Sequence, residues 1–230
     1  MSLRQCLLAE ALGTAFLLAV VVGSGIMGQR LAGGNEALVL LVNSTATGAG
    51  LLALVAALAP VSGAHFNPLV SLMMSVRGDL PWKALPGYVM AQCVGAVVGV
   101  FAAHAMFALP ILELATKPRP GWHLAWSELV ASFGLLLVVH HTSAKRPDAV
   151  PAAVGCYIAA AYWFTSSTSF ANPAVALARA LTDTFTGISP ANLPAFIAAE
   201  LAGALLFLLY LRRTAARTTG GSTRASAEGF

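Results

Sequence analysis

Two short stretches decide the fold of this chain: SGAHFNPLV, residues 62–70, and NPAVALAR, residues 172–179. Each contains an Asn-Pro pair that is followed by about eight residues of helical character. Asparagine is favoured at the N-cap of a helix and proline at the first helical position, because the amide oxygen accepts an orphan backbone N–H and proline has none to leave unpaired. The sequence therefore predicts two short helices that begin at Asn67 and Asn172 and cover residues 69–76 and 174–181.

The composition around these stretches is that of a membrane protein. Of 230 residues, 58% are hydrophobic and only 10% are charged, whereas about a quarter of the residues in a soluble domain carry charge. One soluble core could not bury so much apolar surface, so lipid must solvate much of it. The net charge of +4 is scattered and forms no basic face, which excludes nucleic acid as the expected partner. We expect no metal, no cofactor and no catalytic residues.

Windows without Asp, Glu, Lys or Arg predict six transmembrane helices, because a helix needs about 20 apolar residues to cross the ~30 Å hydrocarbon core. The windows are 11–29, 37–76, 84–112, 129–144, 149–178 and 184–211, the last interrupted only by Glu200. Windows 37–76 and 149–178 are too long for one crossing, and both contain an Asn-Pro pair. A helix of about ten residues rises only ~15 Å, so each extra piece is expected to re-enter the membrane without crossing it.

The second half of the chain repeats the first. The segment PGYVMAQCVGA, residues 86–96, aligns with PAFIAAELAGA, residues 194–204, and the pattern Glu10-x-x-x-Thr14 recurs as Glu128-x-x-x-Ser132. Each half holds three spans, an odd number, so the second copy enters the bilayer inverted. We predict an all-α membrane protein with six transmembrane helices and two re-entrant half-helices in an inverted 3+3 repeat. It forms one domain over residues 1–213, with repeats of about 1–115 and 122–213, and residues 214–230 are expected to be a disordered tail.

The distribution of Lys and Arg predicts the orientation in the membrane. With the N-terminus inside, nine of these residues lie on the inner side and four on the outer side. An excess of Lys and Arg marks the cytoplasmic side. We therefore expect a multi-pass protein of the inner (plasma) membrane with both termini in the cytoplasm.

Inversion brings the N-termini of the two half-helices together near the middle of the membrane, with Asn67 facing Asn172. Both positive dipole ends then point at one place, and each asparagine keeps an NH2 group that can donate to a passing oxygen atom. A cation there meets two partial positive charges in a low dielectric without a compensating carboxylate. The site is expected to admit water and hydroxyl groups and to refuse cations and hydronium.

These residues resemble the aquaporin and aquaglyceroporin (major intrinsic protein) family over about residues 7–213. The resemblance implies one pore per subunit, a homotetramer in the lipid bilayer, and selectivity set by pore diameter, hydrogen-bond lining and an electrostatic barrier. It places the pore midplane at Asn67, Pro68, Leu69, Asn172, Pro173 and Ala174, with leucine where the family usually has alanine in the first motif. By the same analogy, the pore-lining carbonyls belong to Gly63, Ala64, His65, Ser169, Phe170 and Ala171.

The chain departs from the family at the selectivity filter. The residue after Asn-Pro-Ala, where the family nearly always has an arginine, is Val175, and the position on the second helix corresponds to Thr47 instead of a large aromatic residue. Both changes predict a wide constriction without a fixed charge. The resemblance adds Ser169 and either Ala160 or Tyr162 to the filter, and the sequence leaves these two as alternatives.

Three charged side chains have two interpretations each. Glu10 and Glu128 are either acceptors that hold the N–H groups of the re-entrant loops or proton-relay carboxylates. Their recurrence at matched positions without a lysine partner favours the first role. Arg179 lies one turn beyond Val175 and is either a charge in the pore vestibule or a side chain that reaches into the loops.

The favoured function is a passive channel for small neutral polar solutes: glycerol-like polyols, trivalent arsenicals such as arsenous acid, and water. Some bacterial members with altered filters are associated with arsenic resistance, and this chain looks similar to that subgroup. The alternatives are a water-selective aquaporin, an ion-coupled secondary transporter with broken helices, and a junction or scaffold protein that conducts little.

Overall fold

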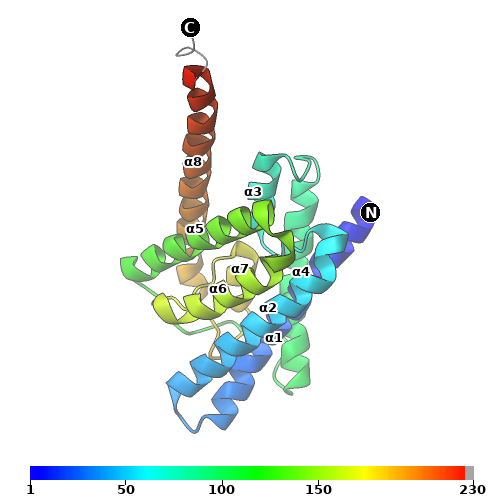
Figure 1. Ribbon diagram of the computed structural model, residues 1–230. Coiled ribbons are helices and arrows are strands. Elements are labelled where there is room, and N and C mark those ends of the chain that lie inside the picture. The colour runs from blue at the N-terminus through cyan, green and yellow to red at the C-terminus, as the bar shows by residue number, and fades with distance from the viewer. Residues whose placement is uncertain (226–230) are drawn as a thin grey trace.

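The computed structural model describes the backbone of residues 1–225 and the side chains of residues 1–214. Within these residues the ordered elements are all helical (Figure 1). The α-helices are α1 (Leu3–Leu31), α2 (Glu36–Ser62), α3 (Pro68–Arg77), α4 (Leu85–Met106), α5 (Trp122–Lys145), α6 (Val150–Phe164), α7 (Pro173–Arg179) and α8 (Leu193–Ala225). Two 3-10 turns, Pro147–Ala149 and Pro190–Asn192, precede α6 and α8.

Of the six predicted transmembrane helices, five have the length and hydropathy of a membrane span. Helices α1, α2, α4 and α5, and the segment Pro190–Thr214 that holds the apolar part of α8, are long and apolar enough to span a membrane. Helix α6 has 15 residues and rises about 22 Å, which makes it the shortest of the six. The half-helices α3 and α7 have 10 and 7 residues and begin at Pro68 and Pro173, each capped by the preceding asparagine as predicted.

The two halves of the chain pack in the same way. Helix α1 contacts α2 and α4, and the equivalent helix α5 contacts α6 and α8. Helices α2 and α6 join the halves, and the half-helices α3 and α7 meet between them. At equivalent crossings, Gly95 of α4 lies against the carbonyl of Ala11, and Gly203 of α8 lies against the carbonyl of Leu129. Small residues allow helix backbones in a membrane to approach this closely.

Gly95→Ala is expected to destabilise the channel, because the new Cβ would overlap the Ala11 carbonyl oxygen of the neighbouring backbone. Overpacking of this kind costs about 1–3 kcal/mol and should lower the melting temperature in detergent by about 5 °C. Gly87→Ala in the same helix is the matched control, since its Cβ would meet only the flexible end of Leu7 at 3.2 Å. Equal melting temperatures for the two variants would contradict the close crossing.

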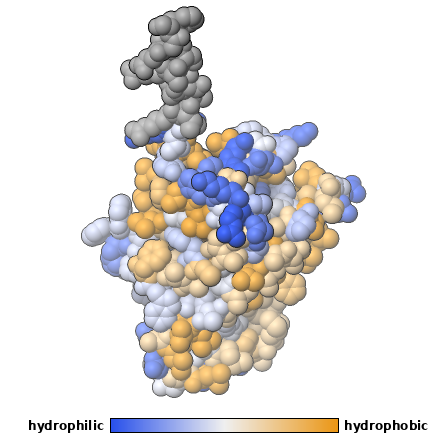
Figure 2. Space-filling model, viewed as in Figure 1, coloured by the Kyte–Doolittle hydropathy of each residue, from blue (hydrophilic) through white to orange (hydrophobic). Residues whose placement is uncertain are grey.

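The outside of the helix bundle is apolar, as a lipid-facing surface requires. Figure 2 shows hydrophobic residues over much of the visible face, with hydrophilic residues gathered towards the upper end of the view. Large exposed hydrophobic side chains occur on α1, α2, α4, α5, α6 and α8, for example Phe16, Leu52 and Leu205. Patches of this extent are rare on soluble monomers.

The tail differs from the prediction. The composition of residues 214–230 predicts disorder, but α8 continues as a helix through Ala225. Once a helix has formed, each further residue adds a hydrogen bond without a new nucleation cost, and the Ala and Arg residues of this segment favour the helical state. Residues 226–230, the rest of the predicted tail, lie outside the described residues.

Candidate pore

The two loops that lead into the half-helices share an unusual backbone. The residues three and one positions before each Asn-Pro asparagine have positive φ angles: Ala64 (50°) and Phe66 (49°) before Asn67, and Ser169 (48°) and Ala171 (48°) before Asn172. None of the four is glycine, and a left-handed conformation costs about 1–2 kcal/mol for such a residue. The same alternation in both loops means that the inverted repeat extends to single backbone torsions.

Two buried carboxylates hold these strained loops. Glu10 of α1 accepts hydrogen bonds from the backbone N–H groups of His65 (2.9 Å) and Phe66 (2.7 Å). Glu128 of α5 accepts them from Phe170 (2.9 Å) and Ala171 (2.7 Å). Charge-assisted hydrogen bonds of this kind are stronger than neutral ones. The contacts match the loop-holding interpretation of both residues.

The Asn-Pro asparagines lock the two loops together. The Oδ1 atoms cap their own helices, accepting from Leu69 N (2.9 Å) and from Ala174 N (3.0 Å). The Nδ2 atoms donate across the midplane, from Asn67 to the Ala171 carbonyl (2.7 Å) and from Asn172 to the Phe66 carbonyl (2.8 Å). The expectation that each NH2 group is free therefore needs correction. One of its two N–H groups is used by the opposite loop and the other remains for a solute.

A cavity of about 210 Å³ runs past both asparagines. All the residues predicted to supply pore-lining carbonyls border it: Gly63, Ala64, His65, Ser169, Phe170 and Ala171. The Ala171 carbonyl accepts a hydrogen bond from Asn67. Its counterpart in the other loop is the Phe66 carbonyl, which was not among the predicted pore-lining groups. Of the midplane residues only the asparagines line the cavity, whereas Leu69 and Ala174 are buried in the core behind it.

Four of the residues predicted for the filter border the cavity. Thr47 of α2, Tyr162 of α6, Ser169 and Val175 are all buried and all line it. The hydroxyl groups of Thr47 and Tyr162 lie 3.3 Å apart, and the Ser169 hydroxyl has no hydrogen-bond partner among the described residues. Ala160 is exposed on the outside of α6 and does not border the cavity. The geometry thus places Tyr162 there instead of Ala160.

One end of the cavity, which we call the Arg179 end, is rich in cations. Arg179 borders the cavity and its guanidinium lies 3.4 Å from the centre of the Phe170 ring, over which Arg119 also lies at 5.1 Å. Arg119 donates to the carbonyls of Gly187 (3.0 Å) and Ser167 (3.1 Å). Burial lowers the pKa of Arg119 to about 10 and the pKa of nearby Lys117 to about 8, the latter also through the charges of Arg119 and Arg179.

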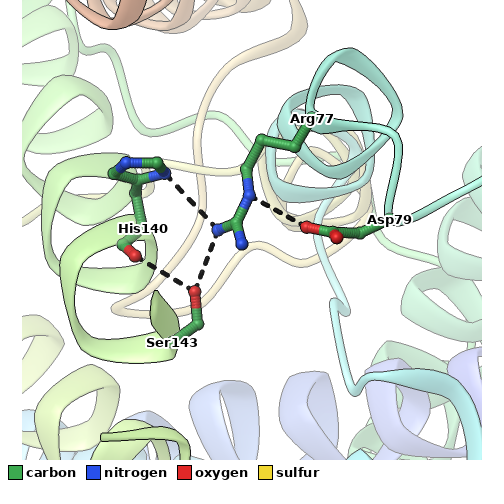
Figure 3. A network of polar contacts seen from close by, with 4 residues as sticks. All are labelled: Arg77, Asp79, His140 and Ser143. Atoms are coloured by element: carbon green, nitrogen blue, oxygen red, sulfur yellow. Dashed lines mark hydrogen bonds and ion pairs between the residues drawn. The ribbon is translucent and has the colours of Figure 1, made fainter. Parts of the chain in front are cut away.

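The opposite end, which we call the Arg77 end, carries a polar network that joins the halves (Figure 3). Arg77 at the end of α3 pairs with Asp79 (2.9 Å) and donates to the Ser143 hydroxyl of α5 (2.9 Å), which borders the cavity. The same guanidinium lies 3.4 Å from Nδ1 of His140. These contacts fix the C-terminus of the first half-helix to the second half of the chain.

Three residues that make contacts at this site were not predicted as site residues from the sequence. Gln92 donates to Glu10 (2.8 Å), and Glu200, at the equivalent place on α8, accepts from Asn172 N (3.1 Å). The alignment of residues 86–96 with 194–204 pairs these two residues, so the repeat contained the signal. Arg119 lies in the loop between α4 and α5, and no pattern in the sequence indicates its contact with Phe170.

Comparison with known proteins agrees with this architecture. The family model for major intrinsic protein matches residues 1–169. The chain is 52% identical to Aquaglyceroporin AqpS of Rhizobium meliloti (strain 1021), over 91% of this chain and 89% of that protein. It is 30% identical to Aquaporin NIP2-2 of Zea mays, over 81% of this chain and 65% of that protein.

A solved structure shares the fold. The X-ray structure of the aquaglyceroporin from Plasmodium falciparum superposes with a TM-score of 0.71 at 22% identity, covering 91% of this chain and 95% of that one. With the family match and the 52% identity, this shows that the chain belongs to the major intrinsic protein family and is a passive membrane channel for small neutral solutes, not an enzyme.

Proposed function

We propose that this channel conducts glycerol-like polyols, trivalent arsenicals such as arsenous acid, and water. The observation that carries the proposal is the lining of the cavity: the hydroxyl groups of Thr47 and Tyr162, 3.3 Å apart, with the apolar side chain of Val175. Hydroxyl groups both donate and accept hydrogen bonds, so they can replace the hydration of a solute that itself carries several hydroxyl groups. Glycerol and arsenous acid each carry three, and an apolar wall suits the carbon side of a polyol.

The pore midplane in this proposal is the pair Asn67 and Asn172 with their prolines. Each asparagine has one N–H left for a passing oxygen atom, and the helix dipoles of α3 and α7 add partial positive charge there. The cavity contains no carboxylate among its lining residues, and coupled transport of cations commonly uses one. We therefore propose uncoupled, downhill flux through Thr47, Tyr162, Ser169 and Val175 as the selectivity filter.

Proteoliposomes test this function directly. We expect the reconstituted protein to raise glycerol and arsenous acid permeability about tenfold or more above empty liposomes, since a barrier lowered by 1.4 kcal/mol gives this factor. A protonophore should leave the rate unchanged. Stopped-flow light scattering measures the rates, with Thr47→Trp as a blocked control. Accumulation above the external concentration would indicate a coupled transporter, water flux without glycerol flux a water-selective aquaporin, and no flux a scaffold protein.

We also propose a homotetramer in the inner membrane with both termini in the cytoplasm. The Arg77 end of the bundle supports this orientation, because Leu80 and Tyr88 pack against Cys6 and Leu7 at the start of α1. The start of α1 and the last part of α8 both lie on the upper side in Figure 1. The same end gathers Arg4, Arg77, Lys83, Lys145 and Arg146. Native mass spectrometry in detergent tests the tetramer, and a fluorescent protein fused to the C-terminus tests its location.

A further inference from the structure

Arg179 is a positively charged residue that borders the cavity one helical turn beyond Val175. It follows Val175 by four residues on α7, so both side chains lie on one helical face. Only 2% of Arg179 is exposed, and it borders the same cavity as Val175. Its Nε donates to the Thr186 carbonyl, and no hydrogen bond of Nη1 or Nη2 occurs within residues 1–214. Four of the five N–H donors of this guanidinium therefore have no partner within residues 1–214.

Within residues 1–214, no carboxylate forms an ion pair with this charge. The ion pairs within residues 1–214 are Arg77–Asp79 and Arg146–Asp148, neither of which lies at the Arg179 end. Arg179 is instead stacked on the Phe170 ring, which also lies under Arg119. An aromatic face stabilises a cation without cancelling its charge. Two buried acids lie nearby, and neither makes an ion pair with Arg179 within residues 1–214. Both oxygens of Glu128 accept from the loop N–H groups of Phe170 and Ala171, and Glu200 accepts from Asn172 N (3.1 Å).

A purely structural role would use Arg179 only to hold the loop that follows α7. Its Nε contact with Thr186 and the hydrogen bond from Ile188 N to its carbonyl (3.2 Å) serve that purpose. Those contacts use one side-chain N–H and the backbone, and they leave the terminal nitrogens without a function. The same contacts hold the guanidinium over Phe170, and both residues border the cavity.

We propose that Arg179 is the specificity-determining cation of this channel and takes the place of the arginine that is absent at Val175. The inference rests on the proposed channel function and adds to it the residue that repels cations. The electrostatic barrier and the narrowest ring then stand at different depths. A hydroxyl-lined ring can stay wide enough for neutral polyols while the charge beyond it keeps cations out.

Arg179→Met and Arg179→Lys in proteoliposomes form the matched pair that tests this proposal. Methionine keeps much of the length and removes the charge, so cation leak, followed with an encapsulated thallium-sensitive dye, should rise about tenfold, because a full charge outweighs the roughly half charges at the N-termini of α3 and α7. Lysine keeps the charge and should leave the leak near the wild-type level. Glycerol permeability, measured in the same liposomes, reports whether each variant is folded and open.

The double variant Val175→Arg/Arg179→Met returns the charge to the constriction. Its cation leak should fall back to the wild-type level while its glycerol permeability decreases. Wild-type leak in Arg179→Met with normal glycerol flux would overturn the proposal, as would equal leak in Arg179→Met and Arg179→Lys. A wild-type protein that conducts no glycerol overturns the proposed function instead, and the leak assay reports on Arg179 independently of it.

A second measurement keeps Arg179 intact, in case its replacement prevents folding. If its guanidinium faces the cavity, Val175→Arg places two like charges four residues apart on one buried face, which is destabilising. Val175→Arg should then melt several degrees below Val175→Met, which has similar length and no charge. Equal melting temperatures would mean that no cation faces position 175, and the proposal would be wrong.

Discussion

Val175→Arg is expected to lower glycerol permeability by about tenfold or more and water permeability by less than about threefold, differences that correspond to roughly 1.4 and 0.6 kcal/mol of barrier height. Val175 is buried and lines the same cavity as Thr47 and Tyr162. Arginine would extend a planar group with five donors into this space. Water needs the smallest opening and can exchange hydrogen bonds with the guanidinium, so it loses least. The glycerol-to-water permeability ratio in liposomes of matched protein content measures the effect.

Two further variants separate size from charge in this experiment. Thr47→Trp narrows the same ring without adding a charge, and Val175→Met adds length alone. A loss of glycerol flux that all three variants share is an effect of the narrower pore. An additional loss in Val175→Arg is an effect of its charge or of the geometry of its donors. An unchanged glycerol-to-water ratio in Val175→Arg would show that residue 175 does not line the constriction.

Asn172→Asp is expected to reduce neutral solute flux about tenfold and to open a cation leak. Aspartate can still cap α7, but it loses the N–H that reaches the Phe66 carbonyl at 2.8 Å and sets a negative charge against that oxygen. Leaving a buried acceptor unpaired costs about 1–3 kcal/mol, so the melting temperature should fall as well. The negative charge attracts the cations that the helix dipoles repel. Asn67→Asp, which loses the bond to Ala171, should behave in the same way.

Asn35→Asp is the matched control for these variants. Asn35 also caps a helix, accepting from Leu38 N at 3.2 Å, but it is exposed at the start of α2 and away from the cavity. Aspartate is as good a cap as asparagine and suits the positive end of a helix. Flux, leak and stability should therefore stay at wild-type values. Wild-type flux and cation exclusion in both Asn67→Asp and Asn172→Asp would rule out the midplane mechanism.

The sequence predicts the overall fold well because its decisive signals are local. An Asn-Pro pair starts a helix by its own chemistry, and the matched acids Glu10 and Glu128 indicate the inverted repeat without any three-dimensional information. The register of α6 is different, since the choice between Ala160 and Tyr162 depends on how α6 turns against α2. The cross-bonds of Asn67 and Asn172 were missed because they join residues 104 and 106 positions apart.

The backbone conformation of the re-entrant loops could not be predicted from the sequence either. Glycine is the residue from which a sequence normally predicts a positive φ angle. In these loops four other residues also adopt one: Ala64, Phe66, Ser169 and Ala171. Their conformation is imposed by tertiary contacts, above all the carboxylates behind them. The orientation of Arg179 has the same origin, because the Phe170 ring and the Thr186 carbonyl that hold it come from different loops.

The reciprocal hydrogen bonds between the asparagines and the opposite loops also constrain the order in which the parts of the molecule can fold. When the first three long helices have been inserted during synthesis, the Asn67 amide and the Phe66 carbonyl have no partner, because Ala171 and Asn172 have not yet been made. Each half supplies one donor and one acceptor to the other, so neither half can finish its own re-entrant loop alone. The channel centre is therefore among the last parts to mature, and a chain that stops before Asn172 would carry an exposed, unfinished loop for membrane quality control to recognise.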